Sequence, residues 1–516
     1  MNHSSASDWL KAWAVKQPGK AAIQQANNTL SYAELDAKVS SVAWALYERG
    51  VRSGDRVAYL VPTNYMSGLV FLALTRLNCV ATPLNPLWRI PQVNAGLETA
   101  AIEWLIAPPL TLRQINVQPP TLPDSHKLPV NEIVEAGHYD GSLDVSPAVP
   151  SKPALLIFTS GSTGNPKAVM HHHSSLAAWT ESTCQYLDIN TTDRLLGVLS
   201  LAFGYGLNQL LCSLYAGATY IATSGQMVHD VLTSARDSQA TVLATVPRLW
   251  REILAELERG QFSGSELALR CATNAGGHLS ANDQKALAGH FTDTAFISMY
   301  GMTETLRSTY VPAEVFDRKA GSLGIAIPGA TIELQNEQGQ RCDVGEVGQI
   351  LQSGPTLASG YFNASQATSE RFREPPQWWN NTSPETRVCF SGDMAVRDDD
   401  GVFWFDSRAD RQIKIMGFRF GPHEVEDIVC ELPSVNDAAL VTLKHNRQNR
   451  LTLAISARMD GLNEDELSQK ITDYLRPKIA SYMIPEKIHV LPTDLPKTAN
   501  QKLDIPKLTE LLSGSA

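Results

Sequence analysis

The sequence predicts an α/β protein with a large N-terminal domain of stacked βα subdomains, a β-rich subdomain, and a small α+β C-terminal domain. The chain has 516 residues, more than one ordinary domain holds. Strand-like and helix-like segments alternate as far as about residue 320, which indicates largely parallel sheets. Beyond that point, short alternating runs between glycine turns indicate antiparallel β-structure.

The N-terminal segments follow one another as strand, helix and strand. The stretch 55–61 predicts a strand, 64–78 a buried helix, and 79–85 the next strand. The apolar window 66–84 contains Arg76 and Asn78, so it is too short and too polar to span a bilayer. Further strands are expected at 154–158, 195–201, 218–223 and 240–246, and helices at 168–183 and from Pro247 onward.

The C-terminal third changes in character. Residues 329–354 predict antiparallel strands, and 394–410 predict a hairpin that turns at the sequence DDDG. A helix after 411–422, a β pair at 437–445 and 450–458, and an amphipathic helix at 463–480 then predict a small domain. We place the boundary at Asp410, which gives an N-terminal domain of residues 1–409 and a C-terminal domain of residues 410–516.

Composition excludes several classes of function. The formal net charge is −10 without a long basic run, which argues against nucleic acid or anionic membrane as the main partner. The seven cysteines are scattered without CxxC spacing, so neither a disulfide framework nor a zinc site is predicted. The N-terminus lacks the features of a signal peptide. We expect a cytoplasmic protein, monomeric or homodimeric.

A glycine-rich stretch, FTSGSTGNPKAVM at 158–170, indicates phosphate binding. It follows an expected strand and precedes an expected helix, where backbone N–H groups can converge on phosphate oxygens. It is not a Walker loop, because Lys167 follows Pro166 and precedes Ala168. The candidate phosphate-binding residues are Thr159, Ser160, Gly161, Ser162, Thr163, Gly164 and Lys167.

Three further stretches follow this loop in order: YGMTET at 300–305, a long stretch at 390–426 that begins FSGDMAVRDDDG, and LPKTANQKLD at 495–504. Together they resemble the acyl-adenylate-forming superfamily of acyl- and aryl-CoA ligases, peptide-synthetase adenylation domains and luciferases. The resemblance runs from about residue 54 to Lys502. It implies that a carboxylate attacks the α-phosphate of MgATP, giving acyl-AMP and pyrophosphate. It also implies that a thiol, of CoA or of a carrier-protein phosphopantetheine, then takes the acyl group.

The resemblance also assigns roles to single residues. Glu304 would hold Mg²⁺, Thr303 would contact the α-phosphate, and Lys502 would reach between the carboxylate and that phosphate. Asp410 would be the hinge of a domain rotation, and Gly417 would line the pantetheine tunnel. The residues implied in AMP binding are Gly276, Gly277, His278, Tyr300 (stacked on adenine), Gly301, Asp393 (on the ribose hydroxyls) and Arg408. Gln501 stands where the family usually has Gly before the lysine.

The stretch 199–218 bears on the acid. Gly204 fills the position where α-amino-acid adenylating enzymes carry an Asp for the substrate ammonium, so α-amino acids are disfavoured. The string FGYGLN looks most like benzoate- and anthranilate-type CoA ligases, with Phe203 as an aromatic gate. The expected lining of a narrow apolar acid pocket is Phe203, Gly204, Tyr205, Gly206, Leu207 and Met302. The polar Asn208 is a candidate for selecting a ring substituent.

Two other interpretations remain beside an acid–CoA ligase. A stand-alone enzyme that loads an acyl or aryl acid onto a carrier protein would share every motif. A nucleotide-binding protein without catalysis would not need Glu304, Asp393 and Lys502, all of which are present. The run His171–His173 suggests a metal cluster, but neighbours on the expected helix point in different directions, so we expect no metal there.

Overall fold

The computed structural model describes most of the chain. The described residues are 5–26, 28–61, 64–115, 122–135, 137, 139, 143, 146–159, 166–223, 227–277, 279–379, 386–408, 413–415, 418–432, 434–445, 448–457, 463–491, 493–496 and 503–513, except the side chains of 407, 408, 419, 423, 445 and 448. Among them, no helix is both long and apolar enough to cross a membrane.

A nine-stranded sheet forms the centre of the first compact unit. Its order is β15-β14-β13-β12-β11-β9-β10-β1-β2, and the strands from β13 to β1 run parallel. The middle strands are apolar and buried on both faces, as parallel strands covered by helices must be. The strands are β1 (Ala21–Gln25), β2 (Asn28–Ser31), β9 (Arg194–Gly197), β10 (Thr219–Ala222), β11 (Val242–Thr245), β12 (Cys271–Asn274), β13 (Ala295–Tyr300), β14 (Thr309–Tyr310) and β15 (Ile325–Ala326).

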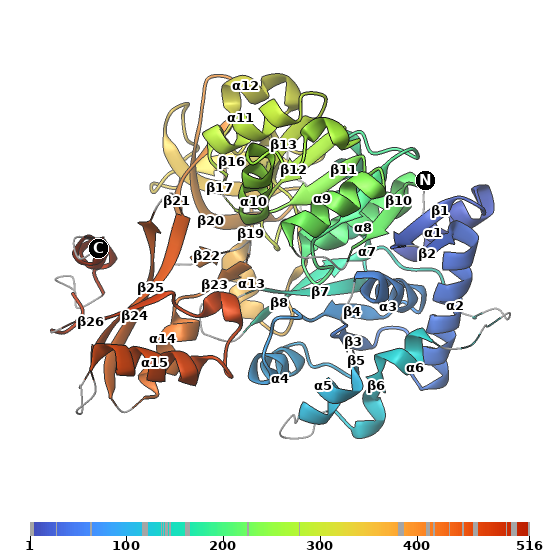
Figure 1. Ribbon diagram of the computed structural model, residues 1–516, viewed down its shortest axis with the longest axis horizontal. Helices are drawn as coiled ribbons and strands as arrows, with labels where there is room; N and C mark the ends of the chain where they lie inside the picture. The colour runs from blue at the N-terminus through green and yellow to red at the C-terminus, as the bar shows by residue number, and fades with distance from the viewer. Residues whose placement is uncertain are drawn as a thin grey trace. The chain divides into compact units, whose positions relative to one another are not determined.

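Helices cover both faces of this sheet. Helices α9, α10 and α11 pack on one face, where Trp250, Phe296 and Leu243 belong to one core cluster (Figure 1). Helices α7 and α8 contribute Cys184 and Cys212 to the cluster on the other face. The helices of this unit are α1 (Ala6–Lys16), α2 (Tyr32–Glu48), α3 (Asn64–Arg76), α5 (Pro109–Gln114), α6 (Val130–Val134), α7 (His173–Tyr186), α8 (Gly204–Ala216), α9 (Val228–Asp237), α10 (Pro247–Glu258), α11 (Ala281–His290), α12 (Phe316–Lys319) and α13 (Ser365–Arg371), with short 3₁₀ turns at Asp124–His126, Gly264–Glu266 and Ala313–Val315.

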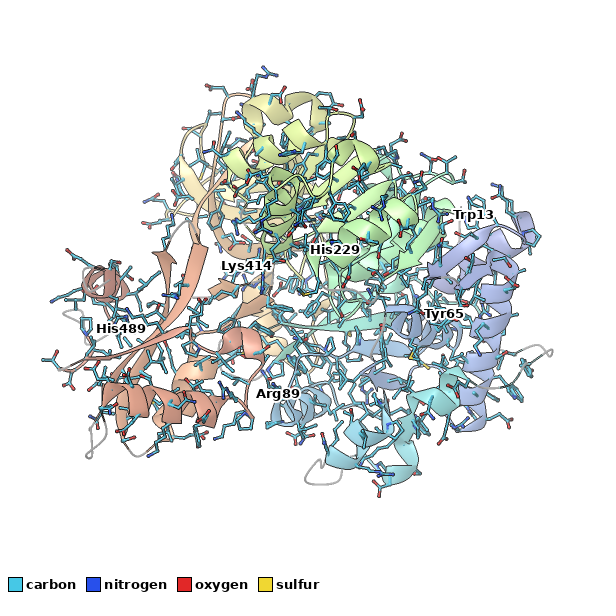
Figure 2. The ribbon with its side chains drawn as sticks, in the orientation of Figure 1. Trp13, Tyr65, Arg89, His229, Lys414 and His489 are labelled. Carbon is cyan, nitrogen blue, oxygen red and sulfur yellow. The ribbon has the colours of Figure 1, made fainter. Side chains whose placement is uncertain are left out.

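The first helices begin and end as their sequences predict. Ser31 and Glu34 form a capping box at the start of α2. Gly217 ends α8 with a φ of 70°, and a Cβ there would come within 2.4 Å of Trp13, which lies on α1 (Figure 2). Only glycine therefore suits both the left-handed turn and the close approach of the indole ring.

A second, seven-stranded sheet has the order β18-β8-β7-β4-β3-β5-β6. Residues from α1, α2, α3 and α8 join those of this sheet in the largest core cluster. Its strands are β3 (Arg56–Tyr59), β4 (Val80–Pro83), β5 (Trp104–Ala107), β6 (Lys127–Pro129), β7 (Pro153–Thr159), β8 (Lys167–His172) and β18 (Gly360–Tyr361).

The expected helix over 168–183 is wrong in its first third. Residues Lys167–His172 form strand β8, and the helix begins only at His173. The reason is tertiary, because Val169 and Met170 pair with the distant strand β18. The glycine-rich stretch therefore connects two strands rather than a strand and a helix.

The β-rich part of the first unit is a five-stranded antiparallel sheet. Its order is β16-β17-β20-β19, and β21 pairs with β20, so the expected antiparallel region and the hairpin at 394–410 are confirmed. Asp398 to Gly401 form the turn. The strands are β16 (Thr331–Gln335), β17 (Val347–Ser353), β19 (Phe372–Arg373), β20 (Val388–Arg397) and β21 (Phe403–Arg408).

The second compact unit comprises Leu87–Thr99, Phe158–Lys167 and Asp410–Ala516. In it, α14 and α15 pack on one face of a three-stranded sheet and α16 on the other. The expected β pair is β24 and β25, which run antiparallel. The elements are α4 (Ile90–Thr99), β22 (Ile413–Ile415), β23 (Phe418–Phe420), α14 (His423–Cys430), β24 (Val435–His445), β25 (Gln448–Ala457), α15 (Glu464–Leu475), a 3₁₀ turn (Ser481–Met483), β26 (Lys487–Leu491) and α16 (Ile505–Ser513).

Candidate active site

The candidate residues of the first unit gather where parallel strands end. Strands β9, β12 and β13 run in the same direction, so their carboxyl ends lie at one edge of the nine-stranded sheet. Open α/β sheets bind ligands at this edge. The three segments that follow these strands carry Phe203 to Tyr205, Gly276 and Gly277, and Tyr300 to Glu304.

The structure brings two expected AMP-binding residues into direct contact. The Tyr300 hydroxyl at the end of β13 donates a hydrogen bond to Oδ2 of Asp393 on β20. Asp393 is 1% exposed, and its backbone N–H donates to Ser391 Oγ at 3.0 Å. Arg408 is the cross-strand neighbour of Asp393 on β21. The carboxylate is thus held on a rigid hairpin, as a fixed hydrogen-bond acceptor must be.

The segment from Gly301 to Ser308 folds back on itself. The Ser308 N–H donates to the Tyr300 carbonyl at 2.9 Å, and a Cβ on Gly301 would lie 2.8 Å from the Cα of Arg307. Glycine is therefore required at 301 by close packing. His171 Nε2 lies 2.9 Å from the Thr303 carbonyl oxygen, which accepts its hydrogen bond and fixes this segment from the neighbouring sheet.

Glu304 is nearly buried and is held by two residues. The Tyr361 hydroxyl donates to Oε1 of Glu304 at 2.7 Å. Burial and the Glu304 charge raise the pKa of Tyr361 well above its usual range, so the hydroxyl stays a donor. Burial alone would lower the pKa of Arg371, but the charge of Glu304 together with Tyr361 and Cys389 raises it, and the pKa lies above its usual range. The carboxylate therefore stands between a fixed donor and a permanent cation.

This carboxylate fits the metal that the resemblance implies. Mg²⁺ in phosphate chemistry is bound by one or two protein carboxylates together with phosphate oxygens rather than by a full protein cage. Within the described part of the chain, no cluster of three or more His, Cys, Asp or Glu side chains forms such a cage. Glu304 is the hard oxygen donor at this edge of the sheet, held in one orientation by Tyr361.

The residues expected in the acid pocket occupy different environments. Phe203 precedes α8, and a Cβ on Gly204 would meet Trp179 at 3.6 Å, an ordinary contact. The Tyr205 hydroxyl lies 2.6 Å from Thr273 Oγ1 at the end of β12. Leu207 belongs to the main core.

Two more of these residues pack tightly. A Cβ on Gly206 would lie 2.2 Å from the Ser200 carbonyl oxygen. Met302 packs in a cluster with Val169 and Tyr361. The lining role of all six residues stays a prediction.

Several expected site residues lie outside the described residues. Of the phosphate loop, Thr159 ends β7 and Lys167 begins β8. Of the glycines after β12, Gly276 has a φ of 87°, and a Cβ on Gly277 would touch Pro247 at 3.0 Å. The residues outside the description are Ser160, Gly161, Ser162, Thr163, Gly164, His278, Asp410, Gly417 and Lys502.

Sequence reasoning missed the residues that hold Glu304 and its segment. Tyr361 and Arg371 follow Glu304 by more than fifty residues, and no motif marks them. His171 was considered only as part of a histidine run. The burial of His171 and Tyr361 can be predicted only if β8 is recognised as a strand that pairs with β18.

Comparison with known proteins identifies the family. The model of the AMP-binding enzymes matches residues 10–362, and the model of the AMP-binding enzyme C-terminal domain matches residues 424–502. The chain belongs to the AMP-binding enzyme family.

Two relatives and one solved structure resemble the whole chain. The indoleacetate–CoA ligase of Aromatoleum aromaticum is 27% identical over 98% of both chains. The 3-hydroxybenzoate–CoA/4-hydroxybenzoate–CoA ligase of Thauera aromatica is 27% identical over 95% of this chain and 93% of the relative. A double mutant of the o-succinylbenzoate CoA synthetase of Bacillus subtilis has the same fold, with a TM-score of 0.84 at 23% identity over 97% and 98% of the two chains. These findings confirm the predicted enzyme class, an AMP-forming acid–thiol ligase, and the predicted fold class.

Proposed function

We propose that this protein activates a compact, aryl-type carboxylic acid with ATP and transfers the acyl group to the thiol of CoA. The observation that carries the proposal is the contact between Tyr300 and the buried Asp393. It joins two of the motifs that carry the resemblance, one at the carboxyl end of β13 and one on β20. The CoA-ligase relatives over nearly the whole chain support the acceptor.

The first half-reaction must bring two anions together. The acid's carboxylate oxygen attacks the α-phosphorus of ATP, the bond to the β-phosphate oxygen breaks, and pyrophosphate leaves. Asp393 accepts hydrogen bonds from the ribose hydroxyls, and Tyr300 keeps that carboxylate oriented. Glu304 would hold Mg²⁺, which would supply charge neutralisation on the phosphates when bound.

Positive charge from the chain completes this step. Lys167 and its loop grip the β- and γ-phosphates, and Lys502 stabilises the charge that develops between the carboxylate and the α-phosphate. The hydrogen bond from His171 to the Thr303 carbonyl keeps the Thr303 side of the segment in place for the α-phosphate.

The second half-reaction requires Lys502 to leave. We propose a rotation of residues 410–516 about Asp410, after which Gly417 borders the pantetheine path. The CoA thiolate sulfur attacks the acyl carbon, the bond from that carbon to the AMP oxygen breaks, and AMP leaves. A carrier-protein thiol would react in the same way, and it is the second candidate acceptor.

The test separates the half-reactions. Lys502→Ala should reduce acid-dependent ATP–pyrophosphate exchange roughly a hundredfold or more, the effect of losing about 3 kcal/mol of transition-state stabilisation. Thioester formation from preformed acyl-AMP should largely persist. Lys507→Ala, an exposed lysine on α16, is the matched control and should change neither rate.

The outcomes are decisive. Equal losses in both half-reactions would contradict the role of Lys502. Thioester formation with a holo-carrier protein but not with free CoA would transfer the proposal to the second acceptor. The absence of any acid-dependent exchange in the natural protein would overturn the proposed function.

A further inference from the structure

Two buried polar side chains beside Tyr205 contain atoms that have no hydrogen-bond partner within the described part of the chain. Asn208 is 1% exposed, and neither its amide nitrogen nor its amide oxygen makes a hydrogen bond there. Arg307 is 3% exposed, and its Nε likewise lacks an acceptor. Native structures satisfy nearly all buried polar groups, so two such residues together require an explanation.

Asn208 and Arg307 share the neighbours Tyr205 and Cys212. Tyr205, Asn208 and Cys212 follow one another on α8 at intervals of three and four residues, so they share one face of the helix. The Arg307 guanidinium lies 5.0 Å from the centre of the Tyr205 ring. Its charge also acts on the thiol of Cys212, one helical turn beyond Asn208. Arg307 therefore lies near Tyr205 and Cys212, the two residues that flank Asn208 on this face of α8.

Within the described part of the chain, the groups that the Arg307 guanidinium acts on are uncharged: the Tyr205 ring, the Tyr186 hydroxyl and the Cys212 thiol. The cluster on this face of the sheet consists of aliphatic, thiol and aromatic side chains, including Tyr186, Tyr205 and Tyr310. Burial raises the pKa of Tyr205, and burial raises that of Tyr186 to about 12, so both hydroxyls stay neutral. Arginine stays protonated at all physiological pH values. A cation this deeply buried is normally paired with an anion.

The segment that carries Arg307 is fixed by other contacts. The Gln352 side-chain nitrogen donates to the Arg307 carbonyl at 3.0 Å, and the tight turn at Gly301 packs on its Cα. The side chain of Arg307 is therefore not needed to fix the backbone of this segment. Arg307 follows Glu304 by three residues, and its guanidinium reaches Tyr205 on α8.

We infer that the acid carries a second anionic group, a carboxylate, which Arg307 and Asn208 bind at the end remote from the reacting carboxyl. The inference rests on the proposed function and specifies its substrate. A guanidinium presents donors in a planar fork that matches the two oxygens of a carboxylate. The Asn208 amide supplies a further donor. A purely apolar acid would leave both groups buried without a partner.

The test compares acids that differ only in the second carboxylate. Benzoate is compared with isophthalate and terephthalate, and hexanoate with adipate, by ATP–pyrophosphate exchange. The natural protein should prefer the dicarboxylate of at least one pair. 3-Hydroxybenzoate serves as a neutral polar probe of the same site.

Arg307→Met should lower the ratio of dicarboxylate to monocarboxylate kcat/KM by roughly tenfold to a hundredfold, because a hydrogen-bonded ion pair is lost. Arg307→Lys should restore part of the ratio. Arg236→Met, an exposed arginine on α9, should leave the ratio unchanged. Asn208→Leu, an apolar replacement of similar size, should lower the same ratio and is a second variant if Arg307→Met does not fold.

Different experimental results would contradict this inference and the proposed function. Exchange with monocarboxylates or 3-hydroxybenzoate alone, unaffected in its acid preference by Arg307→Met, would overturn the second carboxylate and leave the ligase intact. Exchange with no acid at all would overturn the proposed function. Calorimetric titration of isophthalate, terephthalate and adipate into the ATP-free protein would then still test Arg307 directly, because binding that Arg307→Met abolishes supports the site and absent binding refutes it.

Discussion

The burial of His171 predicts how the stability of the protein responds to acid. His171 is fully buried on β8, and burial lowers its pKa to about 4. Nε2 is engaged with the Thr303 carbonyl, and Nδ1 has no partner among the described residues. A proton on Nδ1 would therefore create a charge that the structure does not solvate.

The direction of the change in stability follows from comparing proton binding by His171 in the folded and unfolded chains. Above about pH 6.5 the imidazole is neutral in both, and protonation makes no difference to stability. Between about pH 6.5 and the folded pKa of about 4, the unfolded chain binds a proton that the folded chain rejects, so stability falls as pH falls. The loss between about pH 7 and about pH 5 amounts to about 2 kcal/mol for this one residue.

The assay is urea unfolding of the natural protein and of His171→Gln at these two pH values. A glutamine can still donate to the Thr303 carbonyl but does not titrate. The unfolding free energy of the variant should therefore fall by about 2 kcal/mol less on acidification. His229→Gln is the control, because His229 is exposed on α9 (Figure 2). Equal acid sensitivity of His171→Gln and the natural protein would refute the reasoning.

Two further substitutions test the nucleotide side of the site. Asp393→Asn should weaken AMP binding roughly tenfold to a hundredfold in calorimetry, because the ribose loses a charged acceptor, and an unchanged dissociation constant would remove Asp393 from the site. Tyr361→Phe should raise the Mg²⁺ concentration needed for half-maximal pyrophosphate exchange by roughly tenfold or more, because Glu304 loses its orienting donor. Tyr310→Phe is the matched control, and an unaltered Mg²⁺ requirement in Tyr361→Phe would contradict the role of Tyr361.

The motifs name candidate site residues, but they do not predict which side chains hold those residues in place. Tyr300 and Asp393 were both expected in AMP binding, and the structure joins them by a hydrogen bond. Their spacing of 93 residues gives no sign of contact. The contact depends on β20 lying against the end of β13, which is decided by packing between two sheets rather than by local sequence.

The error at 168–183 arises because tertiary pairing overrides the local helical preference in the first part of the stretch. Alanine, leucine and tryptophan in the second half of this stretch favour a helix, and α7 indeed begins at His173. The preceding six residues alternate only partly in burial, and their strand state depends on pairing with Gly360 and Tyr361. Short strands are stabilised by partners that may be distant in sequence, so a single-sequence pattern assigns them poorly. The same pairing places His171 beneath Thr303 and Tyr361 beside Glu304.

The two charged side chains on the segment from Tyr300 to Ser308 lie in different surroundings, which distinguishes the two ends of the proposed site. Glu304 is tied to Tyr361 and lies in the field of Arg371, which suits a carboxylate that holds a metal beside phosphates. Arg307, three residues further on, lies instead over the Tyr205 ring, and its charge acts on the Cys212 thiol. When one carboxylate of a dicarboxylic acid is bound by Arg307, only the other carboxylate is available to react with the phosphate. The same Arg307 that selects the second carboxylate would thus also decide which carboxylate is activated.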